Sequence, residues 1–137
     1  MRVLLDTNIL ISALMARGTP PDRIYRHWKD ARFDLVACER QLEEIRSVSR
    51  RPYFRDRLKS SEVGRLVNDI RRLALMSEPL HTVTRSPDPN DDFLLAVVES
   101  ASADFLVTGD KSDLLALHTH RTTRIVSARL FADLLDH

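Results

Sequence analysis

Acidic side chains in this sequence follow two apolar runs that have the character of buried strands. Asp6 comes directly after Val3-Leu4-Leu5, and Asp110 comes after Phe105-Leu106-Val107 and a short polar turn. Continuous apolar runs are typical of strands covered on both faces of a parallel sheet, and ligand sites in such sheets lie beyond the carboxyl ends of the strands. We therefore expect Asp6 and Asp110 to meet at one edge of a sheet, with Thr7 or Asn8 capping the helix that follows.

A third acid lies at the start of a predicted helix over residues 91–101. Asp91 shares a helical face with Leu94 and Val98, whereas Asp92 is rotated by about 100° to the flank of that face. An ionised carboxylate on a face that points to the core is costly unless a positive charge meets it, and a divalent metal ion would supply that charge.

A fourth acid belongs to a predicted helix over residues 39–50. Glu44 borders its apolar stripe, whereas Glu43 points away, so Glu44 is the better candidate for a ligand that faces inward. Taken singly, each acid is more simply a helix cap or a solvated charge. Asp88 suits a turn before a proline, and Asp113 either caps the next helix or turns toward the site.

Carboxylates that converge without histidine or cysteine form a set of hard oxygen ligands, which favours Mg²⁺ or Mn²⁺ over zinc. Two such ions about 4 Å apart can bind the attacking water and the leaving oxygen in phosphodiester hydrolysis. Asn8 and Thr108 could orient the carboxylates by hydrogen bonds. The five histidines have no zinc spacing, and no nucleophile-elbow, Walker or dinucleotide motif occurs.

The elements that must position these acids alternate along the chain, which predicts one α/β domain with a mostly parallel sheet and helices on both faces. Strands are expected at 3–5, 33–37, 80–83, 105–107 and 124–126, and helices from 9, from 20, over 39–50, over 61–76, over 91–101, around 114–117 and over 128–135.

Composition limits the class of protein. With 137 residues, a net charge of +1 and one cysteine, Cys38, we expect a single domain over 1–137 without a disulfide, in the reducing cytoplasm. There is neither a signal peptide nor an apolar run of the roughly 20 residues that cross a bilayer, so no membrane association is expected. The one basic run, 50–59, offers Arg50, Arg51, Tyr53 and Arg55 for RNA binding through phosphate contacts and stacking. It is also explained by a solvated loop.

The ordered motifs Leu5-Asp6-Thr7-Asn8, Glu44-Ile45, Asp91-Asp92-Phe93-Leu94 and Val107-Thr108-Gly109-Asp110 resemble those of the PIN domain. The resemblance is closest to toxins of toxin–antitoxin systems that are related to the VapC ribonucleases. It implies a three-layer α/β/α sandwich and a Mg²⁺- or Mn²⁺-dependent endoribonuclease. It also implies a homodimer and a cognate antitoxin that covers the site.

Carried over by position, the resemblance makes Asp6, Glu44, Asp91 and Asp110 the catalytic, metal-binding quartet and Asp113 a fifth ligand. Asn8 and Thr108 match the polar residues that support the quartet. The chain departs from the pattern at Cys38, where serine or threonine is common, and at Ser102, where glycine often stands.

Two other functions fit parts of the pattern. A phosphatase similar to the haloacid dehalogenases also has an aspartate after its first strand, but it needs a second aspartate two residues later, where this chain has Asn8. A non-catalytic PIN-like module that binds RNA or a protein would not need all four acids.

Overall fold

A six-stranded sheet forms the centre of the molecule. The computed structural model describes residues 1–109 and 112–137, and its strands follow the order β3-β2-β1-β4-β6-β5. All neighbouring strands are parallel except β5 and β6, which are antiparallel. The strands are β1 (Arg2–Leu5), β2 (Asp34–Ala37), β3 (Leu75–Met76), β4 (Phe105–Thr108), β5 (Thr119–His120) and β6 (Thr123–Ser127).

Strand β1 lies inside the sheet and is buried on both faces. It pairs with β2 on one side and with β4 on the other, with Leu4 beside Val36 and Leu5 beside Val107. Because side chains alternate along a strand, Val3 and Leu5 join the core on one face and Leu4 joins the core on the other. This explains why the first strand is an unbroken apolar run.

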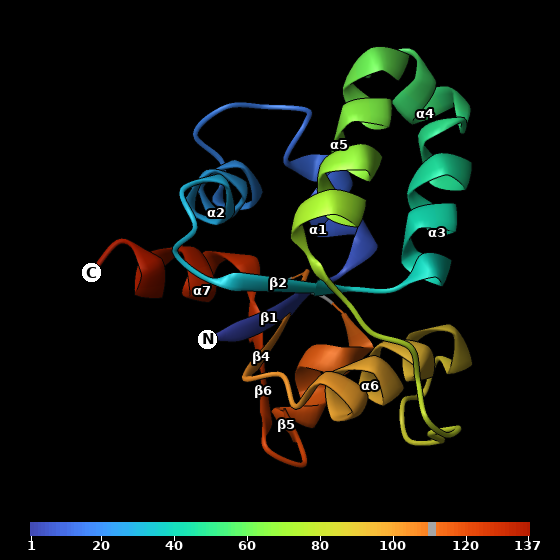
Figure 1. Cartoon of the computed structure of the whole chain (residues 1–137), viewed down its shortest axis with the longest axis vertical. Helices are drawn as coiled ribbons and strands as arrows, with labels where there is room; N and C mark the ends of the chain where they lie inside the picture. Colours follow the sequence, from blue (N-terminus) through green and yellow to red (C-terminus); the bar gives the residue numbers. More distant parts are fainter. Residues whose placement is uncertain (110–111) are drawn as a thin grey trace.

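Helices cover the sheet on both faces, which confirms the predicted three-layer α/β/α sandwich (Figure 1). Helices α1, α2, α3, α5 and α7 contribute to the larger core, whereas α6 and the short 3₁₀ helix η1 pack on the opposite face. The helices are α1 (Thr7–Ser12), α2 (Pro20–Lys29), α3 (Glu39–Ser49), α4 (Pro52–Arg55), α5 (Ser60–Leu73), α6 (Pro89–Ala101), η1 (Asp113–Leu117) and α7 (Ala128–Leu135).

Two predicted elements need correction. Residues 80–83 form no strand, and Leu80 is 81% exposed. The third strand is instead β3, which the sequence pattern assigned to the end of the helix over 61–76. That helix ends at Leu73 because Ala74 is extended, and Leu75 then pairs with Val36. The short elements α4 and β5 were not predicted either, because a helix of one turn and a strand of two residues are too short to show a periodic pattern.

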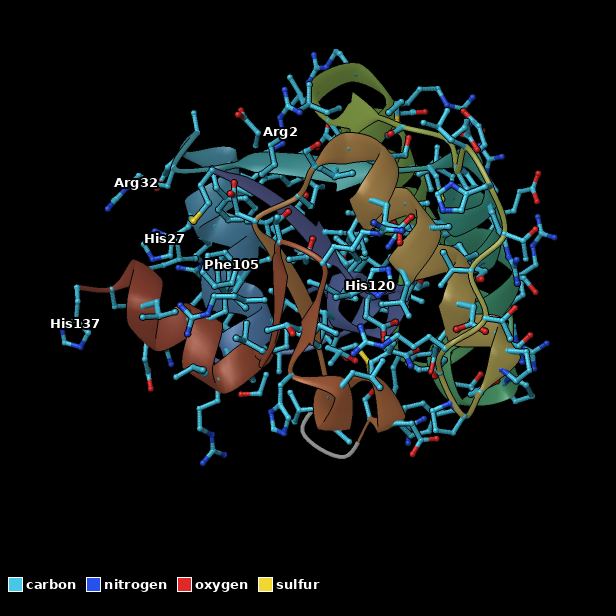
Figure 2. The ribbon with its side chains drawn as sticks, turned by 90° about the horizontal axis from the view of Figure 1, so that it is seen from below. Arg2, His27, Arg32, Phe105, His120 and His137 are labelled. Carbon is cyan, nitrogen blue, oxygen red and sulfur yellow. The ribbon has the colours of Figure 1, made fainter. Side chains whose placement is uncertain are left out.

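The carboxyl-terminal helix α7 packs against α2, and ion pairs join α2 to the residue that follows α7. Arg23 and His27 of α2 contact Asp136 with N–O distances of 2.8 Å each, and Figure 2 shows His27 beside the last helix. In the core, the ring of Phe131 from α7 packs edge-on against Phe33 and at a tilt against Phe105. In the described part of the chain, no helix has both the length and the apolar character needed to span a bilayer.

We expect Phe131→Ala to lower the free energy of unfolding by about 3–5 kcal/mol, because it removes a large side chain that is 1% exposed. Leu134→Ala in the same helix is the matched control and should cost less than about 1 kcal/mol, since Leu134 is 47% exposed. Urea unfolding of both variants measures the difference. Equal losses would show that α7 does not depend on this aromatic contact.

Candidate active site

The order of the strands reverses beside β1. From β1 the chain builds outward through β2 and β3, and it returns through α6 to place β4 on the other side of β1. Such reversals leave a crevice at the carboxyl ends of the two strands. Here the hydroxyl of Thr108 at the end of β4 donates a 3.0 Å hydrogen bond to Oδ2 of Asp6 at the end of β1.

Asp6 has a structural function as well. Its Oδ1 accepts the backbone N–H of Asn8 at 3.3 Å, so that Asp6 caps α1. Neither Thr7 nor Asn8 is the cap, contrary to the sequence prediction, because the helix begins at Thr7. Asn8 remains exposed beside the carboxylate, whereas the Thr7 side chain is buried and turns to α3.

An open hollow of about 420 Å³ lies at this point. Asp6 and Thr108 line one part of it, and Asp91 from α6 and Asp113 from η1 line the rest. The complete lining is Asp6, Asn8, Asp88, Asp91, Thr108, Gly109, Ser112 and Asp113. The structure therefore brings together five of the seven residues that we predicted as ligands or their supports. Asp110 lies outside the described residues.

Two acids that line the hollow lie at the start of a helix: Asp88 is the cap of α6, and Asp113 is in the first turn of η1. Asp88 caps α6 by accepting the N–H of Asn90 at 3.0 Å, and Ser112, not Asp113, caps η1. Asp113 thus lines the hollow, the second of the two positions considered for it. Asp88 was predicted only as a turn residue, and no sequence signal distinguished it from an ordinary cap.

The burial of the two acids at the start of α6 is the reverse of the prediction. Asp92 is only 8% exposed, whereas Asp91 is half-buried. Oδ1 of Asp92 accepts the backbone N–H groups of Arg85 at 3.2 Å and of Ser86 at 2.7 Å, so Asp92 fixes the preceding loop. Asp91 is left to face the other carboxylates.

Glu44 of α3 is linked to the site by a hydrogen bond from Thr7, the residue that follows Asp6. Its Oε2 accepts a 3.2 Å hydrogen bond from the Thr7 hydroxyl, and its Oε1 lies 3.6 Å from Nε of Arg40. Glu43 is exposed, as predicted, and Glu44 does not line the hollow itself. The sequence prediction missed Thr7 and Arg40. Arg40 could have been found, since it lies one helical turn before Glu44.

The acids in the site influence one another. Burial and the nearby charges of Asp6, Asp88, Asp113 and Asp92 raise the pKa of Asp91 to about 6. Burial also raises the pKa of Asp6, against hydrogen bonds from Asn8, Thr108 and Thr7 that lower it. The pKa of Glu44 is raised by burial and by Asp6, while Thr7, Arg40 and Arg51 act in the opposite direction. The site therefore concentrates negative charge.

The chemistry of these donors suits a hard divalent cation. The side chains that line the hollow offer only oxygen atoms as metal ligands, and a bound cation would relieve the repulsion that, together with burial, raises the pKa of Asp91. Within residues 1–109 and 112–137, however, no three histidine, cysteine or acidic side chains are close enough to coordinate one ion together.

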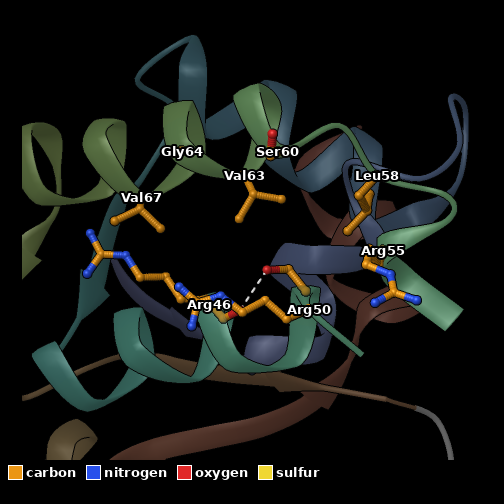
Figure 3. A pocket seen from close by; sticks show the side chains of 9 residues that line it. Arg46, Arg50, Arg55, Leu58, Ser60, Val63, Gly64 and Val67 are labelled. Carbon is orange, nitrogen blue, oxygen red and sulfur yellow. Dashed lines mark hydrogen bonds between the residues drawn. The ribbon is translucent and has the colours of Figure 1, made fainter. Parts of the chain in front are cut away.

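The basic run does not act as one surface. Arg50 and Arg55 line a separate hollow between α3 and α5, together with Arg46 and Val63 (Figure 3). At about 100° per residue, Arg46 and Arg50 are rotated by about 200° and 240° from Glu44, so this hollow faces away from the acids. Arg51 does act on Glu44. Tyr53 is 56% exposed and lies under the guanidinium of Arg57 at 3.9 Å.

We expect Asp91→Asn to stabilise the protein at pH 7.5. The native carboxyl keeps its proton up to about pH 6, whereas the ordinary pKa is 3.8, so the free energy of unfolding falls as the pH rises through this window. After allowance for solvent screening, the gain should be about 1 kcal/mol, or about 3 °C in Tm.

Thermal unfolding in EDTA at pH 7.5 and pH 4 measures this effect, and the gain should disappear at the lower pH. Asp56→Asn is the control, because Asp56 is exposed and lies outside the hollow. An unchanged Tm of Asp91→Asn at pH 7.5 would contradict the inferred repulsion.

A comparison with models of protein families identifies the family. A family model described as PIN domain matches residues 2–112, which include β1 to β4 and every predicted acid except Asp113. No curated protein matched the sequence. PIN domains are typically nucleases and generally use divalent metal ions. Because the match covers more than half of the sequence, the chain belongs to the PIN-domain family.

Proposed function

We propose that this PIN domain is a Mg²⁺- or Mn²⁺-dependent endoribonuclease that hydrolyses phosphodiester bonds of single-stranded RNA. The observation that carries the proposal is the gathering of Asp6, Asp91 and Asp113 around one hollow at the reversal between β1 and β4. The charge of Asp6 and Asp113 on Asp91 supports the binding of a cation there. In the proposal, Asp6, Glu44, Asp91 and Asp110 are the catalytic metal ligands, with Asp113 as a fifth ligand.

Each side chain has a task in this proposal. When bound, divalent ions lower the pKa of water and neutralise the charge that develops on a phosphodiester. Thr108 and the N–H of Asn8 hold the two oxygens of Asp6 in a fixed orientation, at 3.0 and 3.3 Å. The Thr7 hydroxyl holds one oxygen of Glu44, Oε2, by a hydrogen bond of 3.2 Å. Fixed carboxylates lose little freedom when they bind a cation, which favours both binding and catalysis.

The proposal includes a cellular role for the enzyme. We infer a toxin of a type II toxin–antitoxin pair in the cytoplasm, with a homodimer and a cognate antitoxin, because the order and spacing of the acidic motifs resemble those toxins. The single thiol, Cys38, is free and buried, and burial raises its pKa, which suits a residue that takes no part in redox chemistry.

A non-catalytic PIN-like module that binds RNA or a protein is the second candidate. The presence of all four acids in the sequence argues against this module, and a failure to bind metal would favour it. Such a module would bind its partner without a metal and would not cleave it. A phosphatase similar to the haloacid dehalogenases is less well supported, since Asn8 occupies the place of its second aspartate.

Cleavage of a mixed RNA pool by the wild type and by Asp6→Asn, with Mg²⁺, Mn²⁺ or EDTA, tests the proposal. We expect cleavage by the wild type with either ion, and a loss of more than about 100-fold in Asp6→Asn, because a ligand is replaced by an amide. Asp56→Asn should cleave like the wild type. Para-nitrophenyl phosphate, a phosphomonoester, should not be hydrolysed.

A second readout separates binding from cleavage. Mn²⁺ should raise the Tm of the wild type by mass action but have little effect on Asp6→Asn. A wild type that binds RNA but responds to no metal would favour the non-catalytic module. Hydrolysis of the phosphomonoester alone would favour the phosphatase.

A further inference from the structure

A third hollow lies between α6 and the loop that precedes it. Its volume is about 400 Å³, within the range of small-molecule pockets. It shares the amino-terminal part of α6 with the acidic site, since Pro89, Asp92 and Phe93 line it while Asp91 lines the other hollow. Arg40 of α3 lines it as well.

Arg40 connects this hollow with the acids. Its Nε lies 3.6 Å from Oε1 of Glu44, and its guanidinium lies 4.0 Å from the centre of the Phe93 ring. Because α3 and α6 pack on opposite faces of the sheet, Arg40 crosses the sheet edge between them. The side chain is 52% exposed although it touches both partners. One face of the guanidinium thus covers the ring, and the side chain still borders the hollow.

The walls of the hollow suit a flat ligand with a polar edge. Val83, Pro79 and Ala96 supply apolar surface, and the hydroxyl groups of Thr82 and Thr84 supply hydrogen-bonding groups. The loop that carries Thr82, Val83 and Thr84 is fixed to α6, since Asp92 accepts the backbone N–H groups of Arg85 and Ser86 in the same loop. A site with a fixed wall needs little reorganisation to bind a ligand.

We propose that this hollow binds the base of a nucleotide next to the phosphate that is cleaved, with the base stacked on the guanidinium of Arg40. The inference rests on the proposed ribonuclease function and names a specificity subsite for it. Unstacked bases of single-stranded RNA commonly stack on arginine planes and aromatic rings. A phosphate alone fits less well, because Arg40 already has the carboxylate of Glu44 as a partner and much of the lining is apolar.

The experiment measures RNA binding in the Asp6→Asn background, which leaves the RNA intact. Fluorescence anisotropy compares a short single-stranded RNA with copies that each lack one base. We expect one abasic position to weaken binding by about 10-fold, the effect of losing one stacked base. Arg40→Gln should abolish the difference between the intact RNA and that abasic copy. Phe93→Leu should reduce it, since the ring no longer supports the guanidinium.

Arg46→Gln is the matched control, because it removes the same charge from the same helix on the side away from Glu44. It should preserve the difference between intact and abasic RNA. The Tm of each variant shows whether it is folded. If Arg40→Gln weakens intact and abasic RNA by the same factor as Arg46→Gln, Arg40 supplies only charge and the subsite is wrong, although the ribonuclease stands. If the wild type neither binds nor cleaves RNA, the proposed function fails first.

Discussion

The hydrogen bond between Thr108 and Asp6 joins the two strands between which the order of the sheet reverses. It forms only if β1 and β4 are neighbours in register, and the pairing of Leu5 with Val107 sets that register. A carboxylate directly after a fully buried strand has little freedom and is partly desolvated, which raises its pKa. The other acids of the site come to a position that these two strands define.

Placing the acids together costs stability, and the structure limits this cost. Thr7 and Arg40 each lower the pKa of Glu44, against its burial and the charge of Asp6. Asp91 has no comparable hydrogen bond among the described residues, and its pKa rises to about 6. A folded protein that keeps such a group gives up stability at neutral pH, which is common at sites that bind a charged ligand. The charge of Asp6 that acts on Asp91 is thus in keeping with the proposed binding of a cation.

The sequence predicted the parts of this site that depend on buried strands and on helical faces. Asp6, Thr108 and the choice of Glu44 over Glu43 follow from such patterns. The order of burial of Asp91 and Asp92 could not be predicted, because it depends on a loop that folds back over α6 and donates its N–H groups. A helical wheel contains no information about such a loop. Tertiary packing, which the sequence pattern does not show, also explains why Arg50 and Arg55 line the hollow between α3 and α5 and not the acidic hollow.

Helix α3 shows how tertiary contacts replace a local signal. Cys38 stands at its amino-terminal cap and forms no capping hydrogen bond, where a serine or threonine hydroxyl would. The helix is held instead by Gln41, which donates to the carbonyl of Leu5, by Thr7 on Glu44 and by Arg40 over Phe93. Arg40, Gln41 and Glu44 lie on one face of α3, and the end of β1 and the start of α6 together cover this face. The contacts that fix α3 thus include the hydrogen bond from Thr7 that orients Glu44 near the site, so a change that loosens the helix should also disturb the site.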